Sequence, residues 1–388
     1  MMAGNLDLDT LKQDVAGGLV DTVLVCFVDM QGRLIGKRVT GHYFVEQVVH
    51  EMHACDYLLA LDMDMEPVPG YAAASWDKGY GDFAIRPDLA TLRRIPWLEG
   101  TALVLGDVVD HHGEDVAHSP RAILKRQLAR ARAAGFGVNM ASELEFYVFD
   151  EPYGVARKKT YKGLETAGWY IEDYHIFQTT KEESLIRKIR NDMDAAGIPV
   201  EFSKGEWGPG QAELNLKYAE ALEMADRHAI YKNGVKEIAF LQGKAVTFMA
   251  KWDLGLAGSS CHIHTSLIDA DDGAPVFPDE SGNHSELFKH FMAGQLALAR
   301  HHPVPRALHQ LLQALPGRLL RADQGDLEQR QPHGRLPSGR RRALAPGRVP
   351  DPGRRCQSLP GLCGAARRRP ARHRAAARAR ARVHRRCL

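Results

Sequence analysis

Two glutamates one residue apart, Glu143 and Glu145, stand in the stretch MASELEFYVFD. The stretch is rich in apolar and β-prone residues, which predicts a strand. Side chains at positions i and i+2 leave a strand on the same face, so both carboxylates enter one space. There they repel each other and resist ionisation unless a cation lies between them. The pair indicates a cation site; the alternative is an exposed strand face that carries two solvated acids.

Further acids and imidazoles follow along the chain. Glu206 and Glu213 flank a Gly-Pro-Gly turn at 208–210, so the two acids can face each other across the bend. His262 and His264 stand at i and i+2 of a predicted strand and share one of its faces. Four carboxylates and imidazole therefore come from several separate strands.

This donor set is typical of a site for a hard cation. Oxygen ligands suit Mg²⁺ or Mn²⁺, and Mn²⁺ tolerates an imidazole better than Mg²⁺ does. A zinc site would more often contain cysteine or three histidines. Any one of these residues alone fits a structural role, such as a buried strand histidine with satisfied hydrogen bonds. The metal prediction therefore depends on the whole set and its order.

The composition indicates a globular protein of the reducing cytosol. A length of 388 residues allows two domains, and no apolar run is long enough to span a membrane. The first residues contain no apolar core of a signal peptide, so we expect a cytoplasmic protein. Six cysteines lie far apart without a CxxC motif, which favours reduced thiols. They are Cys26, Cys55, Cys261, Cys356, Cys363 and Cys387.

Periodicity and turn residues predict a small sheet crossed by a helix over the first 110 residues. The expected elements are a helix over 5–16, two strands in 20–39 around a turn at 30–33, a helix over 40–52, and strands over 83–89 and 101–109.

A second set of elements must position the acids. It opens with Ser119 and Pro120, a helix cap followed by proline at the first helical position, and this helix ends at Gly135. The fold class predicted from the whole pattern is α+β with mainly antiparallel strands. The further expected helices are 184–197, 218–243 and 284–300, and the strands are 198–202, 211–216, 244–252 and 259–267.

The chain resembles the glutamine synthetase family. The resemblance covers about residues 17–300, in the family's order. It implies a β-grasp N-terminal domain over 17–110, a catalytic domain over 117–301, and rings of subunits in which a neighbour's N-terminal domain completes each site. The matching stretches are GYGDFAIRPDLATLRRIPW (79–97), SPRAILKRQL (119–128), SELEFYVF (142–149), GEWGPGQAEL (205–214) and KAVTFMAKW…GSSCHIHTSL (244–267).

The resemblance also implies roles for single residues. It places Glu145, Glu206 and Glu213 as ligands of a first divalent cation, and Glu143 and His262 as two ligands of a second. The remaining matches are His264 and Ser266 at the ATP phosphates, Tyr218 and Glu201 near the nucleotide, and Gly258 at the glutamate substrate.

The implied reaction is an ATP-dependent ligation with two Mg²⁺ or Mn²⁺ ions per site. ATP phosphorylates the γ-carboxylate of glutamate, and ammonia or an amine then displaces phosphate. Ammonia, and with it glutamine synthesis, is the first expectation; two departures favour the close alternative, a ligase for a larger amine such as a polyamine or ethanolamine. Ala257 stands where the family usually has asparagine, and Asp77 matches the ammonium-binding acid only in an uncertain register. A catalytically dead homologue that acts as a regulator is a further alternative.

The last part of the chain has a different composition. Residues 301–388 contain 21 arginines, no lysine and 4 acids, although the whole chain has a formal net charge of only +3. Residues 303–388 lack Phe, Tyr, Trp, Ile, Met, Lys, Asn and Thr, as expected for a GC-rich gene read out of frame. With chosen codons, segments 309–324, 326–337 and 346–361 read one base later yield the NSYKR, NRT and NPYL motifs of the family in order. We therefore interpret 302–388 as an out-of-frame tail.

A basic tail also fits a nucleic-acid-binding protein or a disordered segment. No aromatic residue is interleaved among the arginines, so base stacking has no platform and nucleic acid is not the expected partner. If the chain is made as written, we expect little ligase activity and an insoluble or partly unfolded product, because strands of the catalytic sheet are missing.

Overall fold

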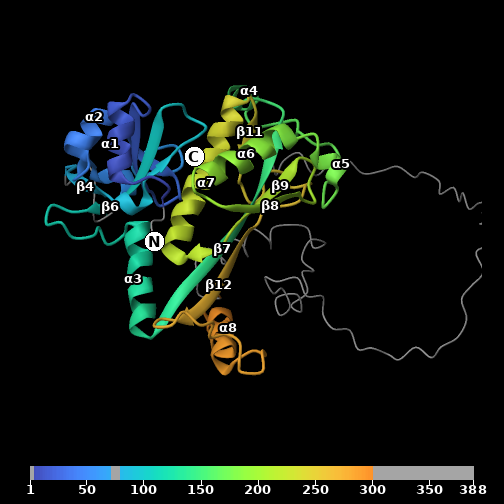
Figure 1. Ribbon diagram of the computed structural model, residues 1–388. Helices are drawn as coiled ribbons and strands as arrows, with labels where there is room; N and C mark the ends of the chain where they lie inside the picture. The colour runs from blue at the N-terminus through green and yellow to red at the C-terminus, as the bar shows by residue number, and fades with distance from the viewer. Residues whose placement is uncertain (1–3, 71–78, 300–388) are drawn as a thin grey trace, which may run out of the picture. The chain divides into compact units, whose positions relative to one another are not determined.

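The computed structural model describes residues 4–70 and 79–299 (Figure 1). Asp77 and the predicted tail over 302–388 lie outside the described residues. The described part contains two six-stranded sheets with helices packed on them. This arrangement confirms the α+β class predicted from the sequence.

The first sheet has the strand order β2-β1-β6-β4-β3, and β5 also pairs with β6. Strands β1 and β6 are parallel, and the other pairs are antiparallel. The predicted hairpin is confirmed, since Gly32 closes its turn with a positive φ of 70°. The strands are β1 (Thr22–Val28), β2 (Leu34–Thr40), β3 (Met52–Cys55), β4 (Asp82–Pro87), β5 (Arg93–Arg94) and β6 (Thr101–Val109).

Helix α1 (Leu8–Ala16) and the short helix α2 (Gly41–Tyr43) pack on this sheet, and α2 continues into a π-helical turn over Phe44–Val48. The helix expected over 40–52 is therefore too long, because Met52 already pairs with Ile85 of β4. Single helical turns of the 3₁₀ type cover Asp56–Leu59 and Leu89–Thr91. A buried apolar cluster that includes Phe27, Phe44 and Ile85 holds these elements together.

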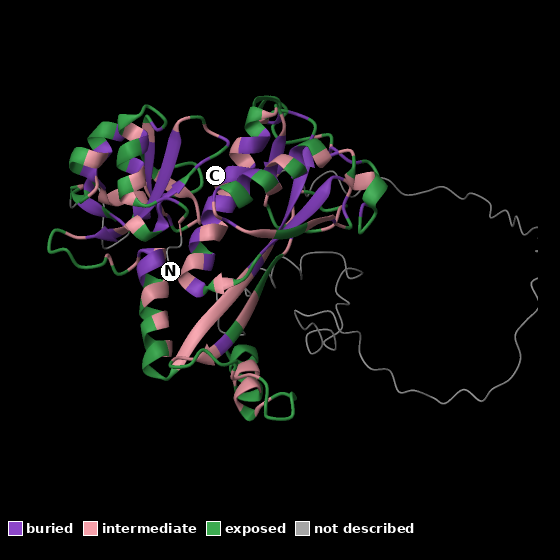
Figure 2. Cartoon of the chain, viewed as in Figure 1, coloured by how far each residue is buried: buried purple, intermediate pink, exposed green. Residues whose placement is uncertain are grey.

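The second sheet is built around β7 (Phe136–Phe149), the strand that carries the paired glutamates. Strands β9 and β10 pair with one edge of β7, and β11 and β12 pair with its opposite edge. Strand β8 pairs with β9. Figure 2 shows that β7 is half-buried in its first part and almost fully buried in its second. The partner strands are β8 (Val200–Gly205), β9 (Gln211–Leu216), β10 (Ala219–Glu220), β11 (Ala245–Thr247) and β12 (Cys261–Asp269).

The strand predicted over 244–252 is shorter in the structure and ends at Thr247. Thr247 pairs with Tyr147 of β7. From Leu144 back to Phe136, the same edge of β7 pairs with β12, which begins at Cys261. Since one edge holds one partner at a time, the chain between the two strands has to leave the sheet.

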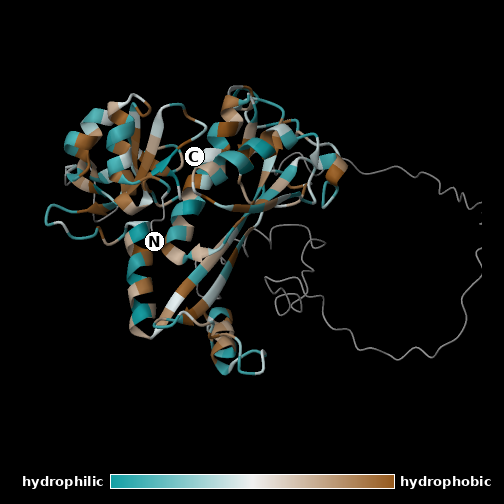
Figure 3. Cartoon of the chain, viewed as in Figure 1, coloured by the Kyte–Doolittle hydropathy of each residue, from teal (hydrophilic) through white to brown (hydrophobic). Residues whose placement is uncertain are grey.

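Within residues 79–299, six helices follow the first sheet. Helix α3 begins at Pro120 as predicted and ends just before Gly135, whose φ of 87° suits glycine. Figure 3 shows apolar residues along α8, of which Leu296 and Leu298 are exposed. The helices are α3 (Pro120–Ala133), α4 (Tyr153–Lys158), α5 (Ile176–Thr179), α6 (Glu183–Ala195), α7 (Ala221–Leu241) and α8 (Glu286–Ala299). None of the described helices is long and apolar enough to cross a bilayer.

One apolar core joins the second sheet to the first. Helices α6 and α7 bury Ile189 and Ile238 against it, and Trp97 and Leu105 of the first part belong to the same cluster. The indole Nε1 of Trp97 donates to Glu237 of α7 at 2.8 Å. Helices α6 and α7 and part of the first sheet therefore pack against the second sheet.

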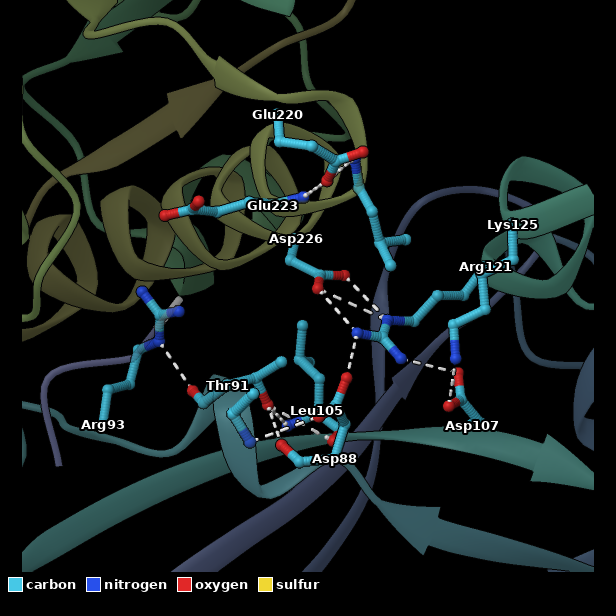
Figure 4. A network of polar contacts seen from close by, with 12 residues as sticks. Asp88, Thr91, Arg93, Leu105, Asp107, Arg121, Lys125, Glu220, Glu223 and Asp226 are labelled. Carbon is cyan, nitrogen blue, oxygen red and sulfur yellow. Dashed lines mark hydrogen bonds and ion pairs between the residues drawn. The ribbon is translucent and has the colours of Figure 1, made fainter. Parts of the chain in front are cut away.

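A buried ion-pair cluster ties the same parts together. We call it the Arg121 cluster; it consists of Asp88, Asp107, Arg121, Lys125 and Asp226 (Figure 4). The Arg121 guanidinium donates to Asp88 and Asp107 at 2.6 Å and to Asp226 at 3.0 Å. Burial alone would lower the pKa of Arg121, but the aspartates raise it above its ordinary range. Helices α3 and α7 are thereby fixed to the ends of β4 and β6.

Candidate metal centre

Strand pairing brings the predicted acids together on adjacent strands. Glu145 of β7 lies opposite Glu213 of β9, and Glu143 lies opposite His262 of β12. β9 follows the tight turn at 208–210, where a Cβ on Gly208 would lie 1.9 Å from the Tyr147 hydroxyl. Only glycine fits there, so the turn can press against β7 and bring Glu206 toward Glu213.

Two groups of candidate ligand atoms result. In each, all the atoms lie within 4.8 Å of one another. One group is Glu145, Glu206 and Glu213, and the other is Glu143, Glu213 and His262. Glu213 belongs to both. We call these five residues the glutamate centre; the sequence had predicted all five, and the structure adds that Glu213 is shared.

The centre is electrostatically unfavourable without a cation. Glu213 is 4% exposed, and burial, aided by Glu206 and Glu143, raises its pKa to about 7. Burial likewise raises the pKa of Glu145, although the Ser260 amide opposes the shift with a hydrogen bond of 2.9 Å. Carboxylates with raised pKa values release their protons when a divalent cation binds.

The donor set fits a hard divalent cation. Two groups of carboxylate oxygens, one of which includes an imidazole nitrogen, match the preference of Mg²⁺ or Mn²⁺ better than that of zinc. The acidic groups could therefore hold a metal. Imidazole contacts support this arrangement, since His262 Nδ1 lies 3.3 Å and His264 Nε2 lies 3.0 Å from the two oxygens of Glu143.

Two further residues that the sequence reasoning missed hold the centre. Gln211, which is 1% exposed, donates from Nε2 to Glu145 at 3.1 Å and to the carbonyl of Gly258 at 2.9 Å. Lys204 of β8 forms an ion pair with Glu206. The period of two along each strand could have found them, because Gln211 precedes Glu213 by two positions and Lys204 precedes Glu206 by two.

The remaining predicted residues lie at different distances from the centre. Gly258 adjoins it through Gln211. Ser266 follows His264 by two positions on the same face of β12, but it is exposed and pairs with Asn139, away from Glu143. Within the described residues, Glu201 and Tyr218 are exposed and belong to neither group of ligand atoms.

Comparisons with known proteins agree with this fold. The family described as "Glutamine synthetase, catalytic domain" matches residues 117–304. Among solved structures, "Apo GmaS without ligand" is similar with a TM-score of 0.63 and 26% identity, and the match covers 76% of this chain and 64% of that one. The chain therefore has a catalytic domain of the glutamine synthetase type. It belongs to the glutamine synthetase family.

Two curated relatives are similar over most of the chain. "Gamma-glutamylethanolamide synthetase GlnA4" of Streptomyces coelicolor is 48% identical over 305 residues, which are 78% of this chain and 65% of the relative. "Glutamate--isopropylamine ligase" of a Pseudomonas species is 36% identical over 284 residues, which are 72% of this chain and 62% of the relative. The chain thus spans less than two thirds of the length of either relative.

Proposed function

We propose that this protein is an ATP-dependent ligase that joins glutamate to an amine through a γ-glutamyl phosphate. The observation that carries the proposal is the pair of ligand groups that share Glu213. Phosphoryl transfer between two anions needs such a centre, because the γ-phosphate and the carboxylate of the substrate repel each other. When bound, two divalent ions would neutralise these anions and the charge that develops in the transition state.

The residues of this chain have separable parts in the proposal. Glu145, Glu206 and Glu213 would hold the first ion, and Glu143 and His262 would hold the second together with Glu213. Gln211 fixes the Glu145 carboxylate, so its oxygens keep their direction when the substrates enter. The identity of the ions, Mg²⁺ or Mn²⁺, is part of the proposal.

The substrate contacts are also proposed. His264 and Ser266 follow His262 along one face of β12, a direction that suits the phosphates of ATP leading away from the metal ligands. The carbonyl of Gly258 lies at the other end of the centre, beside Gln211, where glutamate would bind. Tyr218 and Glu201 would contact the nucleotide outside the centre.

We favour an organic amine over ammonia as the second substrate. The two relatives at 48% and 36% identity are named as a γ-glutamylethanolamide synthetase and a glutamate–isopropylamine ligase. Ala257, whose carbonyl accepts from the Tyr147 hydroxyl at 2.9 Å, replaces the asparagine that the family usually has. Ammonia, and with it glutamine synthesis, is the second candidate.

The test is a phosphate-release assay with glutamate, ATP and single amines: ammonia, ethanolamine, isopropylamine and a polyamine. We expect turnover with an organic amine and a requirement for Mn²⁺ or Mg²⁺. The Glu213→Gln variant should lose both turnover and metal binding. Turnover with ammonia alone would contradict the amine preference. Turnover that survives chelation and the Glu213→Gln change would contradict the ligase proposal.

The tail bears on which chain to assay. We propose that residues from about 301 onward are read out of frame, and the family match ends at residue 304, where the arginine-rich composition begins. Among the named strands of the described residues, β12 pairs with β7; on its other edge, residues 267–269 already bond to the segment 274–276, so the first part of that edge could take a further strand. Sequencing the gene across the codons for 299–305 decides this, and an intact frame would contradict it.

The assay is therefore run on the chain as written and on a frame-restored chain. The frame-restored chain would turn over and assemble into a ring of subunits, which light scattering after gel filtration measures. Activity of the chain as written at the same level would contradict the predicted damage.

A further inference from the structure

Lys204 is a half-buried cation beside the glutamate centre, and the proposed reaction assigns it no role. It lies on β8 directly opposite Glu213 of β9, and its side chain is 17% exposed. Its ammonium forms an ion pair and a hydrogen bond with Glu206. A lysine placed at this register reaches the position that a cation bound to Glu145, Glu206 and Glu213 would take.

The charge of the centre explains why a lysine is tolerated there. Glu143, Glu145, Glu206 and Glu213 bring four carboxylates together. Among the ion pairs of the described residues, the one from Lys204 is the one that brings an ammonium to these acids. Like charges this close destabilise the fold unless a cation offsets them. Without metal, Lys204 is that cation.

The same ammonium also lies near a second carboxylate and an aromatic ring. Lys204 Nζ lies 3.9 Å from Asp173 Oδ1 and 4.8 Å from the centre of the Tyr174 ring. Tyr174 has a φ of 55°, which is uncommon for a bulky residue and costs free energy. The backbone of Glu172 holds this segment in place by donating to the Glu206 carbonyl at 3.3 Å. Asp173 and Tyr174 thus hold the ammonium together with Glu206, and they can keep it when Glu206 binds another cation.

We propose that Lys204 is a built-in counter-ion of the Glu206 carboxylate in the absence of metal, and that a divalent cation displaces its ammonium from Glu206 while Asp173 and Tyr174 keep their contacts with it. This inference rests on the proposed function, since it assumes that the centre binds a metal. The ammonium and the metal compete for the Glu206 carboxylate. Lys204 therefore stabilises the metal-free fold and weakens metal binding, so the two effects have opposite signs.

The experiment compares Mn²⁺ binding and thermal stability in Lys204→Met, Lys204→Arg and the unchanged sequence, all in the frame-restored chain, at one pH and without substrates. Electron paramagnetic resonance of free Mn²⁺ gives the dissociation constant, and differential scanning fluorimetry with a chelator gives the Tm of the metal-free protein. Lys204→Met should bind Mn²⁺ about tenfold more tightly, because a positive charge a few ångströms away has been removed. Its metal-free Tm should fall.

Two variants serve as controls. Lys204→Arg keeps the charge, so its Mn²⁺ affinity should stay near that of the unchanged chain. Lys181→Met removes a lysine that lies over the Trp169 ring at 3.9 Å and reaches Gln178 rather than the glutamates. It should leave the Mn²⁺ affinity unchanged, which separates competition at the centre from a general change in charge.

Each outcome decides the inference. Weaker or unchanged Mn²⁺ binding in Lys204→Met would show that Lys204 only positions Glu206, and would overturn the proposal. An unchanged metal-free Tm would overturn the counter-ion role. If neither the unchanged chain nor Lys204→Met binds Mn²⁺, the proposed function fails, and with it the inference that metal displaces the Lys204 ammonium. Binding by the unchanged chain together with the wrong sign in Lys204→Met refutes this inference alone.

Discussion

The Arg121 cluster and the glutamate centre gather acids to a similar degree of burial, yet they are neutralised differently. Asp226 is 3% exposed in the first, and Glu213 is 4% exposed in the second. A single guanidinium reaches all three aspartates of the Arg121 cluster, and Lys125 adds a second cation. In the glutamate centre, one ammonium reaches one glutamate.

This difference separates a structural cluster from a functional one. The five donors of a guanidinium occupy the aspartate oxygens in fixed directions, so no ligand positions remain for a metal. The glutamate centre keeps oxygens that lack a permanent cation, and the strands behind them hold these oxygens close together. Burial of acids alone does not mark a binding site; the supply of cations from the chain itself distinguishes the two cases.

The largest effect should follow from removing the central cation of the Arg121 cluster. Arg121→Met leaves three aspartates without their common partner, and breaking a buried ion pair costs about 3–5 kcal/mol. We expect the Tm to fall by roughly 10 °C, as measured by differential scanning fluorimetry. Arg130→Met, on the exposed end of the same helix, serves as the control and should change the Tm little. A Tm near that of the unchanged chain would show that solvent already screens the cluster.

The opposite result is expected in the glutamate centre. Glu213→Gln removes the ligand that both groups share, so Mn²⁺ affinity should fall at least about 100-fold. The metal-free Tm should stay or rise, because a buried like charge with a pKa raised to about 7 has been removed. Isothermal titration calorimetry and fluorimetry measure the two quantities, and Glu201→Gln is the exposed control. A fall in the metal-free Tm would mean that Glu213 is structural, as the aspartates are.

The sequence predicted the glutamate centre better than the Arg121 cluster, and the reason is geometric. The acids of the centre come from strands, where a period of two and a Gly-Pro-Gly turn fix which side chains share a face. The strand predicted over 211–216 has these bounds in the structure, as β9 does. The Arg121 cluster joins Arg121 to Asp226, 105 positions away, and its members stand on helices and strands that share no common period. No local pattern specifies such pairs.

The sequence likewise did not predict which strands pair with the two edges of β7. Four strands share its two edges, and the choice of Cys261 opposite Leu144 ends β11 early. The period of two places Gln211 and Lys204 two positions before acids, but their contacts follow only from the register: Lys204 lies opposite Glu213, and Gln211 reaches Glu145 from its position opposite Tyr147. The register follows from packing of the whole sheet against α6 and α7, which is a property of the tertiary structure.

A third group of acids, Glu172 and Glu182, extends the comparison, because a proton rather than a cation neutralises one of its carboxylates. Glu172 and Glu182 are both buried, and burial together with Glu172 raises the pKa of Glu182 to about 8. An unfolded chain releases this proton near pH 4.5, whereas the folded chain keeps it up to about pH 8. Stability contributed by this group therefore falls as the pH rises through that window.

Glu182→Gln supplies a neutral group at every pH and should remove this loss. We expect its Tm to exceed that of the unchanged chain by about 3 °C at pH 8, and the difference should vanish toward pH 4.5. Fluorimetry across this pH range measures it, with the exposed Glu286→Gln as control. A lower Tm at pH 8 would mean that the pair is ionised and held by a cation, as in the other two clusters.

The smallest effect should come from the outer cation of the Arg121 cluster. Lys125 is 32% exposed on its side chain and pairs only with Asp107 among the described ion pairs, and Asp107 keeps Arg121 as a partner. Lys125→Met should therefore cost about 0.5 kcal/mol, the range of partly exposed ion pairs. A Tm change of about 1–2 °C would follow. If Lys125→Met instead lowered the Tm as much as Arg121→Met does, both cations would be required to balance the three aspartates. The Arg121 cluster would then lie close to the charge imbalance that, in the glutamate centre, a bound divalent cation would offset.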